Sequence, residues 1–525
     1  MPPKRKHKAG FDARQSLKKR QLKYQDKNNL LRKAHAEKIR KLRAASALVP
    51  HRITPQQAQY FLSRLDPRPG NTAAHIKSAL QGLKCVVDQL TEDERVFDRL
   101  CSTGVVGKLV PLVSPAFDAQ ADVQEAALDL ITSVCCSSTG CGHVAREPGI
   151  VPHVARLLGR TDTPVKVLQS AFFVMHNIVV DCHEYRCMFL ENNLLYVVQK
   201  HEKHPEACIR ECFWELVWML TNFLRLRDNP RRKEDQGVPA KYAEALSVTL
   251  RRALPTSNVC VLQALDNLAQ NQSYLDLLMR ANVLEPVMPF CVPAPQVNST
   301  TSMTVLSLVS HFTYGERRHM HYLVSLGILP VLSLVLNHAQ ASPNMIQHSC
   351  FMLTNVFMDL EQLPQIGQQL VQGPAAGLIP ALHQLSQPQN PRFHTEACVA
   401  LCSFVKQVPT WTELRPCLEH RALEVVLGVI VNGTLEQTRL MQAINTGSST
   451  KHIPLNGTER YAILIALRAL GNILRVVPAP QWNPAQKDRV RNVLQQVAQL
   501  SHTLMHWCAD EAQRCLRTYF TLPHQ

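Results

Sequence analysis

The sequence predicts an all-α protein in which a basic N-terminal arm, helical or disordered, precedes a right-handed superhelical solenoid of repeated helices. A short apolar phrase that begins at a small or turn-forming residue recurs along the chain, as in GIVPHVARLL from Gly149 and GILPVLSLV from Gly327. Apolar residues at i, i+3, i+4 and i+7 fill a second stretch before each phrase, which is typical of helices. Val/Ile runs bounded by hairpin turns are lacking. The phrases begin at residues 104, 149, 193, 237, 282, 327, 377 and 421.

The spacing of these phrases predicts the type of repeat. They lie 44 to 50 residues apart, a period that belongs to armadillo and HEAT repeats, whose two or three helices bury their apolar faces by stacking on neighbours. The residues after position 50 are also too many for one ordinary hydrophobic core. We therefore expect an armadillo-repeat array of about eight or nine repeats over residues 71–515.

The first 50 residues hold most of the net charge. They contain 16 Lys and Arg against three acids, whereas the rest of the chain contains 41 bases and 38 acids. This uneven distribution of charge predicts a detachable arm at residues 1–50 that binds an acidic surface or nucleic acid. The segment PPKRKHK at 2–8 is either a nuclear localisation signal or a flexible basic tail. We expect a linker at 51–70 and a C-terminal tail at 516–525.

The apolar stretch that precedes each phrase predicts one longer helix in every repeat. Polar insertions interrupt the array at about 226–238, 362–376 and 434–456, and the last of these is expected to form a mobile loop. The clearest helical stretches are VKVLQSAFFVMHNIVV from Val165, ECFWELVWMLTNFL from Glu211, NVCVLQALDNLA from Asn258 and IQHSCFMLTNVF from Ile346.

Asn residues recur at one register of these helices. Asn is mildly unfavourable inside a helix, and its recurrence 45 residues apart at 177, 222 and 267 is hard to attribute to packing. Each amide offers a donor and an acceptor to the main chain of an extended peptide, and an aromatic residue four positions earlier can hold a Lys or Arg stem. The pairs with this spacing are Phe173–Asn177, Trp218–Asn222 and Phe351–Asn355, with Arg468–Asn472 in the same relation.

These motifs resemble a known family. WMLTN (218–222), FMLTN (351–355) and ALRALGN (466–472) are similar to the inner-helix motif of importin alpha, the armadillo adaptor that binds nuclear localisation signals. Residues 14–43, with LLRKA at 30–34, resemble the importin-beta-binding segment of that family. The resemblance places Asp181 at the acidic position that receives a signal lysine, and an acid one turn past Asn177 would lie beside the same groove.

The resemblance implies three sets of site residues. The peptide-binding groove would contain Phe173, Asn177, Asp181, Trp218, Asn222, Asn267, Phe351, Asn355, Arg468 and Asn472. The carrier-binding arm would use Arg14, Lys18, Lys19, Arg20, Leu31, Arg32, Lys33, Lys38 and Ile39. An autoinhibitory cluster that re-enters the groove would consist of Arg40, Lys41 and Arg43.

Some repeats depart from the family pattern. Gln263 stands in the aromatic position ahead of Asn267, and the Asn itself is missing near His311. Thr132 occupies the Asn position of an earlier repeat, and Val399 and Ser403 share the four-residue spacing without forming an aromatic–Asn pair.

The resemblance implies a nuclear import adaptor that shuttles between cytoplasm and nucleus. Its partners would be basic signal-bearing cargo proteins, an importin-beta-type carrier, nuclear pore proteins and an export receptor. The alternative is a non-transport armadillo scaffold whose basic tail binds nucleic acid or other acidic partners. No enzyme motif, cofactor, membrane span or small-molecule substrate is indicated.

Cysteine usage fits the same interpretation. Many of the 17 Cys lie in apolar runs, and we expect reduced core residues of an intracellular protein. Cys135, Cys136, Cys141 and His143 invite a zinc interpretation, but they lack a second ligand pair and are expected to be structural, so no metal is predicted.

Overall fold

In a computed structural model of the chain, the described residues form helices joined by turns, with one isolated β-bridge between Ala294 and Val297. The chain divides into two compact units, Met1–Tyr242 (unit 1) and Ala243–Gln525 (unit 2). The residues that the structure describes are 55–65, 71–90, 98, 100–181, 185, 188–189, 194–225, 238–254, 258–295, 297–358, 370, 373, 375–387, 393–419, 421–445, 457–499 and 506–520.

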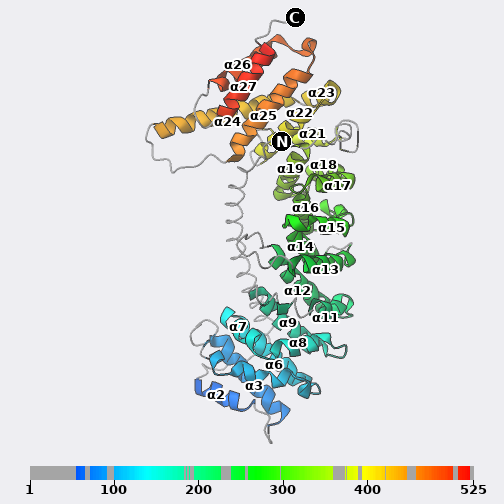
Figure 1. The fold of residues 1–525 in the computed structure, drawn as a ribbon, viewed down its shortest axis with the longest axis vertical. Coiled ribbons are helices and arrows are strands. Elements are labelled where there is room, and N and C mark those ends of the chain that lie inside the picture. Colours follow the sequence, from blue (N-terminus) through cyan, green and yellow to red (C-terminus); the bar gives the residue numbers. More distant parts are fainter. Residues whose placement is uncertain are drawn as a thin grey trace. The chain divides into compact units, whose positions relative to one another are not determined.

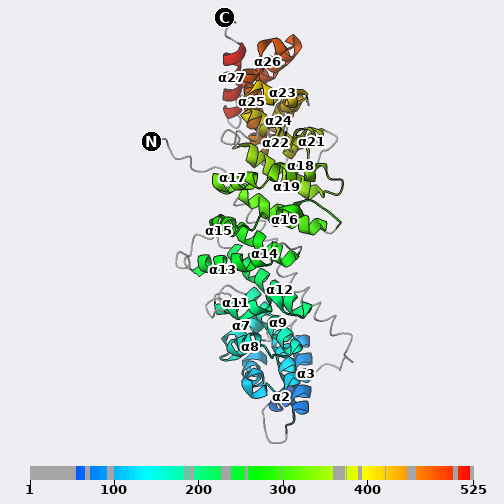
Figure 2. The same ribbon diagram turned by 90° about the vertical axis from the view of Figure 1, so that its right-hand side faces the viewer.

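Unit 1 consists of two layers of helices. In the first layer, α3, α6, α9 and α12 pack side by side in chain order (Figures 1 and 2). In the second layer, α8 packs on η1 and on α11. The elements are α2 (Pro55–Ser63), α3 (Ala73–Leu90), α5 (Val105–Leu109), η1 (Pro111–Val113), η2 (Pro115–Phe117), α6 (Ala121–Val134), α7 (Ser138–Arg146), α8 (Ile150–Gly159), α9 (Val165–Asp181), α11 (Leu194–Gln199), η3 (Lys200–Lys203) and α12 (Ala207–Arg225).

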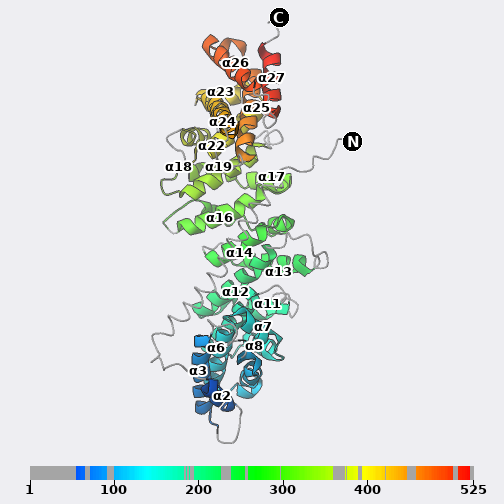
Figure 3. The same ribbon diagram turned by 90° about the vertical axis from the view of Figure 1, so that its left-hand side faces the viewer.

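Unit 2 repeats this arrangement. Its first layer is α14, α16, α19, α22 and α25, which follow one another in chain order (Figure 3), and α27 packs on α25. Its elements are α13 (Val238–Arg252, which begins before the unit boundary), α14 (Val259–Ala269), η5 (Gln272–Tyr274), α15 (Leu275–Arg280), η6 (Met288–Cys291), α16 (Ser299–Phe312), α17 (Arg317–Ser325), α18 (Ile328–Asn337), α19 (Pro343–Met358), α21 (Leu378–Leu385), α22 (His394–Gln407), α23 (Trp411–Glu419), α24 (Ala422–Asn445), α25 (Gly457–Val476), η8 (Ala479–Gln481), α26 (Pro484–Ala498) and α27 (His506–Phe520).

The fold is therefore the predicted all-α, armadillo-type repeat array. The helices predicted from Val165, Glu211, Asn258 and Ile346 all lie in the first layer, in α9, α12, α14 and α19. Their apolar stripes form the core between neighbouring repeats, as where the buried rings of Phe357 and Phe404 meet with centroids 5.0 Å apart. A repeat that buries its stripe only against the next repeat has to stack.

The first residue of the apolar phrase starts the second-layer helix by turning the chain. Gly149 has φ 98° and caps α8, and a Cβ there would lie 2.8 Å from Val110 Cγ1, so glycine is required by both backbone and space. Two phrases begin with other residues in the same left-handed region, Asn282 (φ 49°) and Arg421 (φ 57°). Arg has no local compensation for this conformation, so Arg421 is a strained position.

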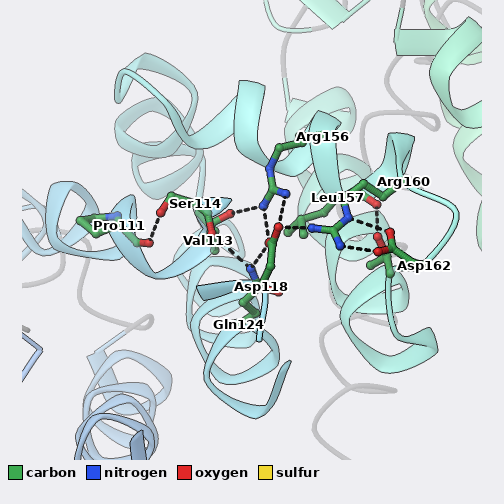
Figure 4. A network of polar contacts seen from close by, with 10 residues as sticks. Pro111, Val113, Ser114, Asp118, Gln124, Arg156, Leu157, Arg160 and Asp162 are labelled. Carbon is green, nitrogen blue, oxygen red and sulfur yellow. Dashed lines mark hydrogen bonds and ion pairs between the residues drawn. The ribbon is translucent and has the colours of Figure 1, made fainter. Parts of the chain in front are cut away.

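Polar contacts between neighbouring repeats keep the repeat spacing. In unit 1, Lys77 Nζ lies 2.7 Å from Asp122 Oδ2 and Lys84 Nζ lies 3.3 Å from Asp129 Oδ2, each across 45 residues of sequence. In the second layer, Asp118 lies between Arg156 and Arg160 of the next repeat (Figure 4). The hydrogen bond from Arg156 is the main cause of the lowered pKa of Asp118.

Three predicted boundaries shift in the structure. The predicted linker contains helix α2, because Leu62 and Leu65 are buried where α2 packs on α3. The predicted tail begins inside α27, which runs to Phe520. The insertion expected as a loop at 434–456 is helical as far as Asn445, because α24 continues the apolar helix that starts at Ala422.

Among the described residues, no single helix is long and apolar enough to cross a membrane. The pair α17 and α18, bent by 70° at its break, passes that test by length and composition when the two helices are taken together.

Candidate functional site

The predicted groove residues lie on the first layer of both units. Phe173, Asn177 and Asp181 belong to α9, and Trp218 and Asn222 belong to α12. In unit 2, Asn267 lies on α14, Phe351 and Asn355 on α19, and Arg468 and Asn472 on α25. The side chains of Asp181 and Asn222 fall outside the described part of the structure.

In unit 1, the register is partly open to solvent. Phe173 and Asn177 are both half-buried on α9, and Asn177 Nδ2 lies 3.5 Å from the carbonyl oxygen of Thr132 on α6. This contact is at the outer limit of a hydrogen bond. The amide therefore sits at the contact between two first-layer helices without being enclosed by it.

Trp218 lies at the same register on the next helix, 45 residues after Phe173. Its side chain is half-buried. Glu211 and Glu215 precede it by seven and three residues, so they share its face of α12. Glu211 is exposed, and Glu215 is 30 % exposed with its Oε2 3.9 Å from Nδ1 of the buried His176. An aromatic ring with carboxylates one and two turns away is suited to a cationic side chain.

Behind this surface, His176 occupies the core between α9 and α12. Its Nε2 donates to the Cys212 carbonyl at 2.8 Å. Burial lowers the pKa of His176 to about 4, and the hydrogen bond to Cys212 opposes that shift. The imidazole is therefore neutral near pH 7 and belongs to the packing of the repeat.

In unit 2, an ion pair joins α14 and α16 beside the same register. Asn267 is only 4 % exposed, and the next helix carries His311 in place of an Asn. His311 Nε2 lies 3.1 Å from Asp266 Oδ1. Burial raises the pKa of Asp266, but hydrogen bonds from His311, Ser307 and Gln270 outweigh burial and lower it overall. The residue that departs from the family pattern therefore has a structural partner 45 residues away.

The next pair, Phe351 and Asn355, lies against the end of α16. Asn355 Nδ2 donates to Thr313 Oγ1 at 3.0 Å. The ring of Phe351 is 4.8 Å from that of Tyr314, which is 51 % exposed. Tyr314 extends the aromatic surface of this repeat and was not predicted from the sequence, because it follows the helix end and has no counterpart at the Asn register.

The last Asn of this register, Asn472, is buried, with 7 % of its surface exposed. Its Nδ2 donates to the carbonyls of Val405 and Val408 at 2.8 Å each. Those carbonyls belong to the C-terminal end of α22, where helices leave such groups without partners. Both amide hydrogens are used inside the protein, so Asn472 is a helix cap, and its predicted role of donating to a peptide is incompatible with these bonds. Its neighbour Arg468 is exposed.

The recurrence of Asn therefore has a packing explanation that we did not anticipate. Asn177, Asn355 and Asn472 each donate toward the C-terminal end of the preceding first-layer helix. Gln407 does the same to the carbonyl of Met358 at 2.9 Å. A polar side chain at this register, or one turn after it as at Gln407, therefore joins successive first-layer helices, in addition to any role in ligand binding.

The Cys and His residues near 135–143 act within the fold. Cys141 Sγ lies 3.0 Å from the Cys135 carbonyl, and His143 Nε2 lies 3.0 Å from Asp98 Oδ1. Cys136 is exposed. Among the described residues, no group of three His, Cys, Asp or Glu could hold a metal ion.

The predicted residues of the N-terminal arm lie outside the described residues. This applies to all of the carrier-binding positions and to Arg40, Lys41 and Arg43.

Comparisons with known proteins address the fold. No protein-family model matches the sequence, and no curated protein is significantly similar to it. A crystal structure of an engineered protein from the Northeast Structural Genomics Consortium has a TM-score of 0.61 and 16% identity, covering 88% of this chain and 98% of that chain. A designed armadillo repeat protein (TM-score 0.38, 17% identity) covers 48% of this chain and 99% of its own. Computationally designed armadillo repeat proteins for modular peptide recognition (TM-score 0.37, 16% identity) cover 52% and 97%.

Proposed function

We propose that this protein is a nuclear import adaptor whose unit 1 binds Lys/Arg-rich peptides in extended form across α9 and α12. The observation that carries this proposal is the surface formed by Phe173, Trp218, Glu211 and Glu215. The two aromatic residues share one register on neighbouring helices, and the carboxylates lie on the same face of α12 as Trp218. The aromatic faces hold the stems of Lys or Arg, and the carboxylates pair with their charges.

The basic arm is the second part of the proposal. Its 13 net positive charges suit an acidic surface on an import carrier of the importin beta type. When the carrier is absent, the cluster Arg40, Lys41 and Arg43 competes with cargo for the unit 1 surface. One segment cannot occupy two acidic surfaces at once, so carrier binding favours cargo binding and loss of the carrier favours cargo release. The proposal also includes an export receptor, contacts with nuclear pore proteins, and shuttling between the cytoplasm and the nucleus.

Binding of a labelled seven-residue Lys/Arg peptide, followed by fluorescence polarisation, tests the unit 1 surface. The double substitution Trp218→Ala and Asn222→Ala should weaken binding about tenfold, because it removes cation–π and packing contacts worth about 1 to 2 kcal/mol. Trp411→Ala, a half-buried Trp of unit 2, is the matched control and should bind as the unsubstituted protein does. Equal affinities of the double variant and the control would rule the surface out.

Deletion of residues 1–50 tests the arm. The deletion should raise affinity for the basic peptide and abolish binding to an importin-beta-type carrier. A scaffold whose arm binds nucleic acid would behave differently: deletion would leave peptide affinity unchanged and remove binding to an oligonucleotide with a steep salt dependence.

A further inference from the structure

The last first-layer helix of unit 2 exposes arginines instead of aromatic residues and carboxylates. Arg468 and Arg475 are seven residues apart on α25, so they lie on one face of that helix, and both are exposed. Helix α27 packs on α25 (Figure 1) and brings further cations to it.

Arg514 of α27 reaches α25 between these two arginines. A Cβ built on Gly471 would lie 3.9 Å from Arg514 Nη2 and 3.2 Å from Cys515 Sγ, so α27 crosses α25 closely at this glycine. Arg475 reaches back to the same place, because its Nη2 donates to Asn472 Oδ1, so the Arg514 and Arg475 guanidinium groups lie beside residues 471 and 472. Arg468 lies on the same face about one turn earlier. We call Arg468, Arg514 and Arg475 the arginine row.

The contacts of the arginine row leave it with excess positive charge. Arg475 Nη2 donates to Asn472 Oδ1 at 2.6 Å, a neutral acceptor. Arg514 pairs with Glu511, whose side chain is 14 % exposed. The described part of α27 has one further carboxylate, Asp510, and one further exposed base, Arg517. Two of the three guanidiniums in the row therefore have no carboxylate within ion-pair distance among the described residues.

A hydroxyl group completes this surface. Tyr519 is half-buried on α27, and Arg514 and Arg475 both act on its phenol. Burial and the neighbouring Cys515 raise the pKa of Tyr519 more than these arginines lower it. The phenol therefore stays protonated at neutral pH and can donate a hydrogen bond beside two guanidinium groups.

The dimensions of the row select its ligand. The four residues from Arg468 to Asn472 span about 6 Å of helix, close to the roughly 7 Å between side chains two residues apart in an extended chain. Alternate side chains of such a chain face the same side, so an acid that meets Arg468 is followed two residues later by one that meets Arg475 and Arg514. Arg guanidinium groups bind carboxylates in bidentate geometry. A nucleic acid duplex would present many more phosphates than three arginines can neutralise.

We propose that the arginine row of α25 and α27 binds an extended acidic peptide of a partner protein. The carboxylates of that peptide pair with Arg468, Arg514 and Arg475, and Tyr519 donates to one of them. This goes beyond the proposed function, because a cationic signal peptide would be repelled here, and the protein would carry two peptide sites of opposite charge.

Fluorescence polarisation of the full chain with a labelled peptide of alternating Glu and Ser tests the proposal. The double substitution Arg475→Glu and Arg514→Glu should weaken binding at least tenfold. Arg415→Glu with Arg489→Glu, which changes the same charge at exposed positions of α23 and α26, should change it less than twofold. The basic arm is identical in both variants, so arm binding cannot produce the difference. Thermal unfolding shows whether each variant is folded. If the charge-reversal variant is unfolded, the neutral double substitution Arg475→Gln and Arg514→Gln takes its place.

Two outcomes would overturn the proposal. Equal affinities of the row variant and its control would show that the arm or another surface binds the acidic peptide. A row variant that loses binding to an oligonucleotide but keeps the acidic peptide would make the row a nucleic-acid site. Affinity for the Lys/Arg peptide, measured on the same preparations, should be unchanged in the row variant, so failure of one site is distinguishable from failure of the other.

Discussion

Asn177 in unit 1 and Asn472 in unit 2 occupy the same register of a first-layer helix but have different surroundings. Asn177 is half-buried and makes one long contact of 3.5 Å to the preceding helix. Asn472 is buried and donates twice at 2.8 Å. The first can still meet a ligand, whereas the second is fully used as a cap. Equivalent positions in a repeat protein can therefore serve different roles, one in ligand binding and another in stabilising the fold.

The surroundings differ in charge as well. Trp218 in unit 1 has Glu211 and Glu215 on its face of α12, whereas Asn472 lies among Arg468, Arg475 and Arg514. The repeat provides the same helix geometry in both places, and the side chains around the register decide which ligand charge it accepts.

Acid should separate the two units most strongly. His176 in unit 1 is neutral when folded, with a pKa of about 4, and in the unfolded chain its pKa is near 6.5. Below pH 6.5, His176 binds a proton in the unfolded state but not in the folded state. The free energy of unfolding therefore falls as the pH drops from 6.5 to 4. The loss approaches about 3 kcal/mol. Asp266 in unit 2 has a lowered pKa, so its contribution is lost only below about pH 4.

Hydrogen exchange followed by mass spectrometry between pH 7 and pH 4.5, corrected for intrinsic rates, measures this difference. Peptides from α9 and α12 should lose protection before peptides from α14 and α16. His176→Gln keeps a donor for the Cys212 carbonyl and should remove the His176 part of the pH dependence of α9 and α12, while the part from His201, whose pKa is also lowered by burial, remains. If that variant is as acid-sensitive as the unsubstituted protein, the assignment to His176 is wrong.

Removal of the two amides should give the next largest difference. Asn472→Ala leaves the Val405 and Val408 carbonyls without their donors and should cost about 2 to 3 kcal/mol of unfolding free energy. Asn177→Ala removes one weak contact at a partly exposed site and should cost less than about 1 kcal/mol. Urea unfolding checks both values. Equal costs would mean that the register has one role throughout the chain.

The smallest expected effects concern the turns that start the second-layer helices. Arg421→Gly relieves a left-handed backbone and should stabilise unit 2 by up to about 1 kcal/mol. Gly149→Ala in unit 1 should destabilise by more than about 1 kcal/mol, since its Cβ would also meet Val110. Thermal unfolding should show midpoint shifts of opposite sign. Shifts of the same sign would contradict the common role of these positions.

Much of the fold was predictable because armadillo-type repeats depend on local patterns. The helical spacing of apolar residues located α9, α12, α14 and α19, and the turn-forming residues marked the starts of second-layer helices at Gly104, Gly149 and Gly327. The site was less predictable. The Asn register is visible in the sequence, but its hydrogen-bond partners lie on the preceding repeat, and the sequence does not show which amides reach them.

The sequence by itself determined the repeat period, the helical class and the separation of a basic arm from a nearly neutral body, because each depends on composition or on spacing along one helix. Only the tertiary structure decided that Asn472 is a cap, that His311 pairs with Asp266, and that Arg514 reaches α25 at Gly471. These outcomes depend on side chains from different helices whose distance is set by packing.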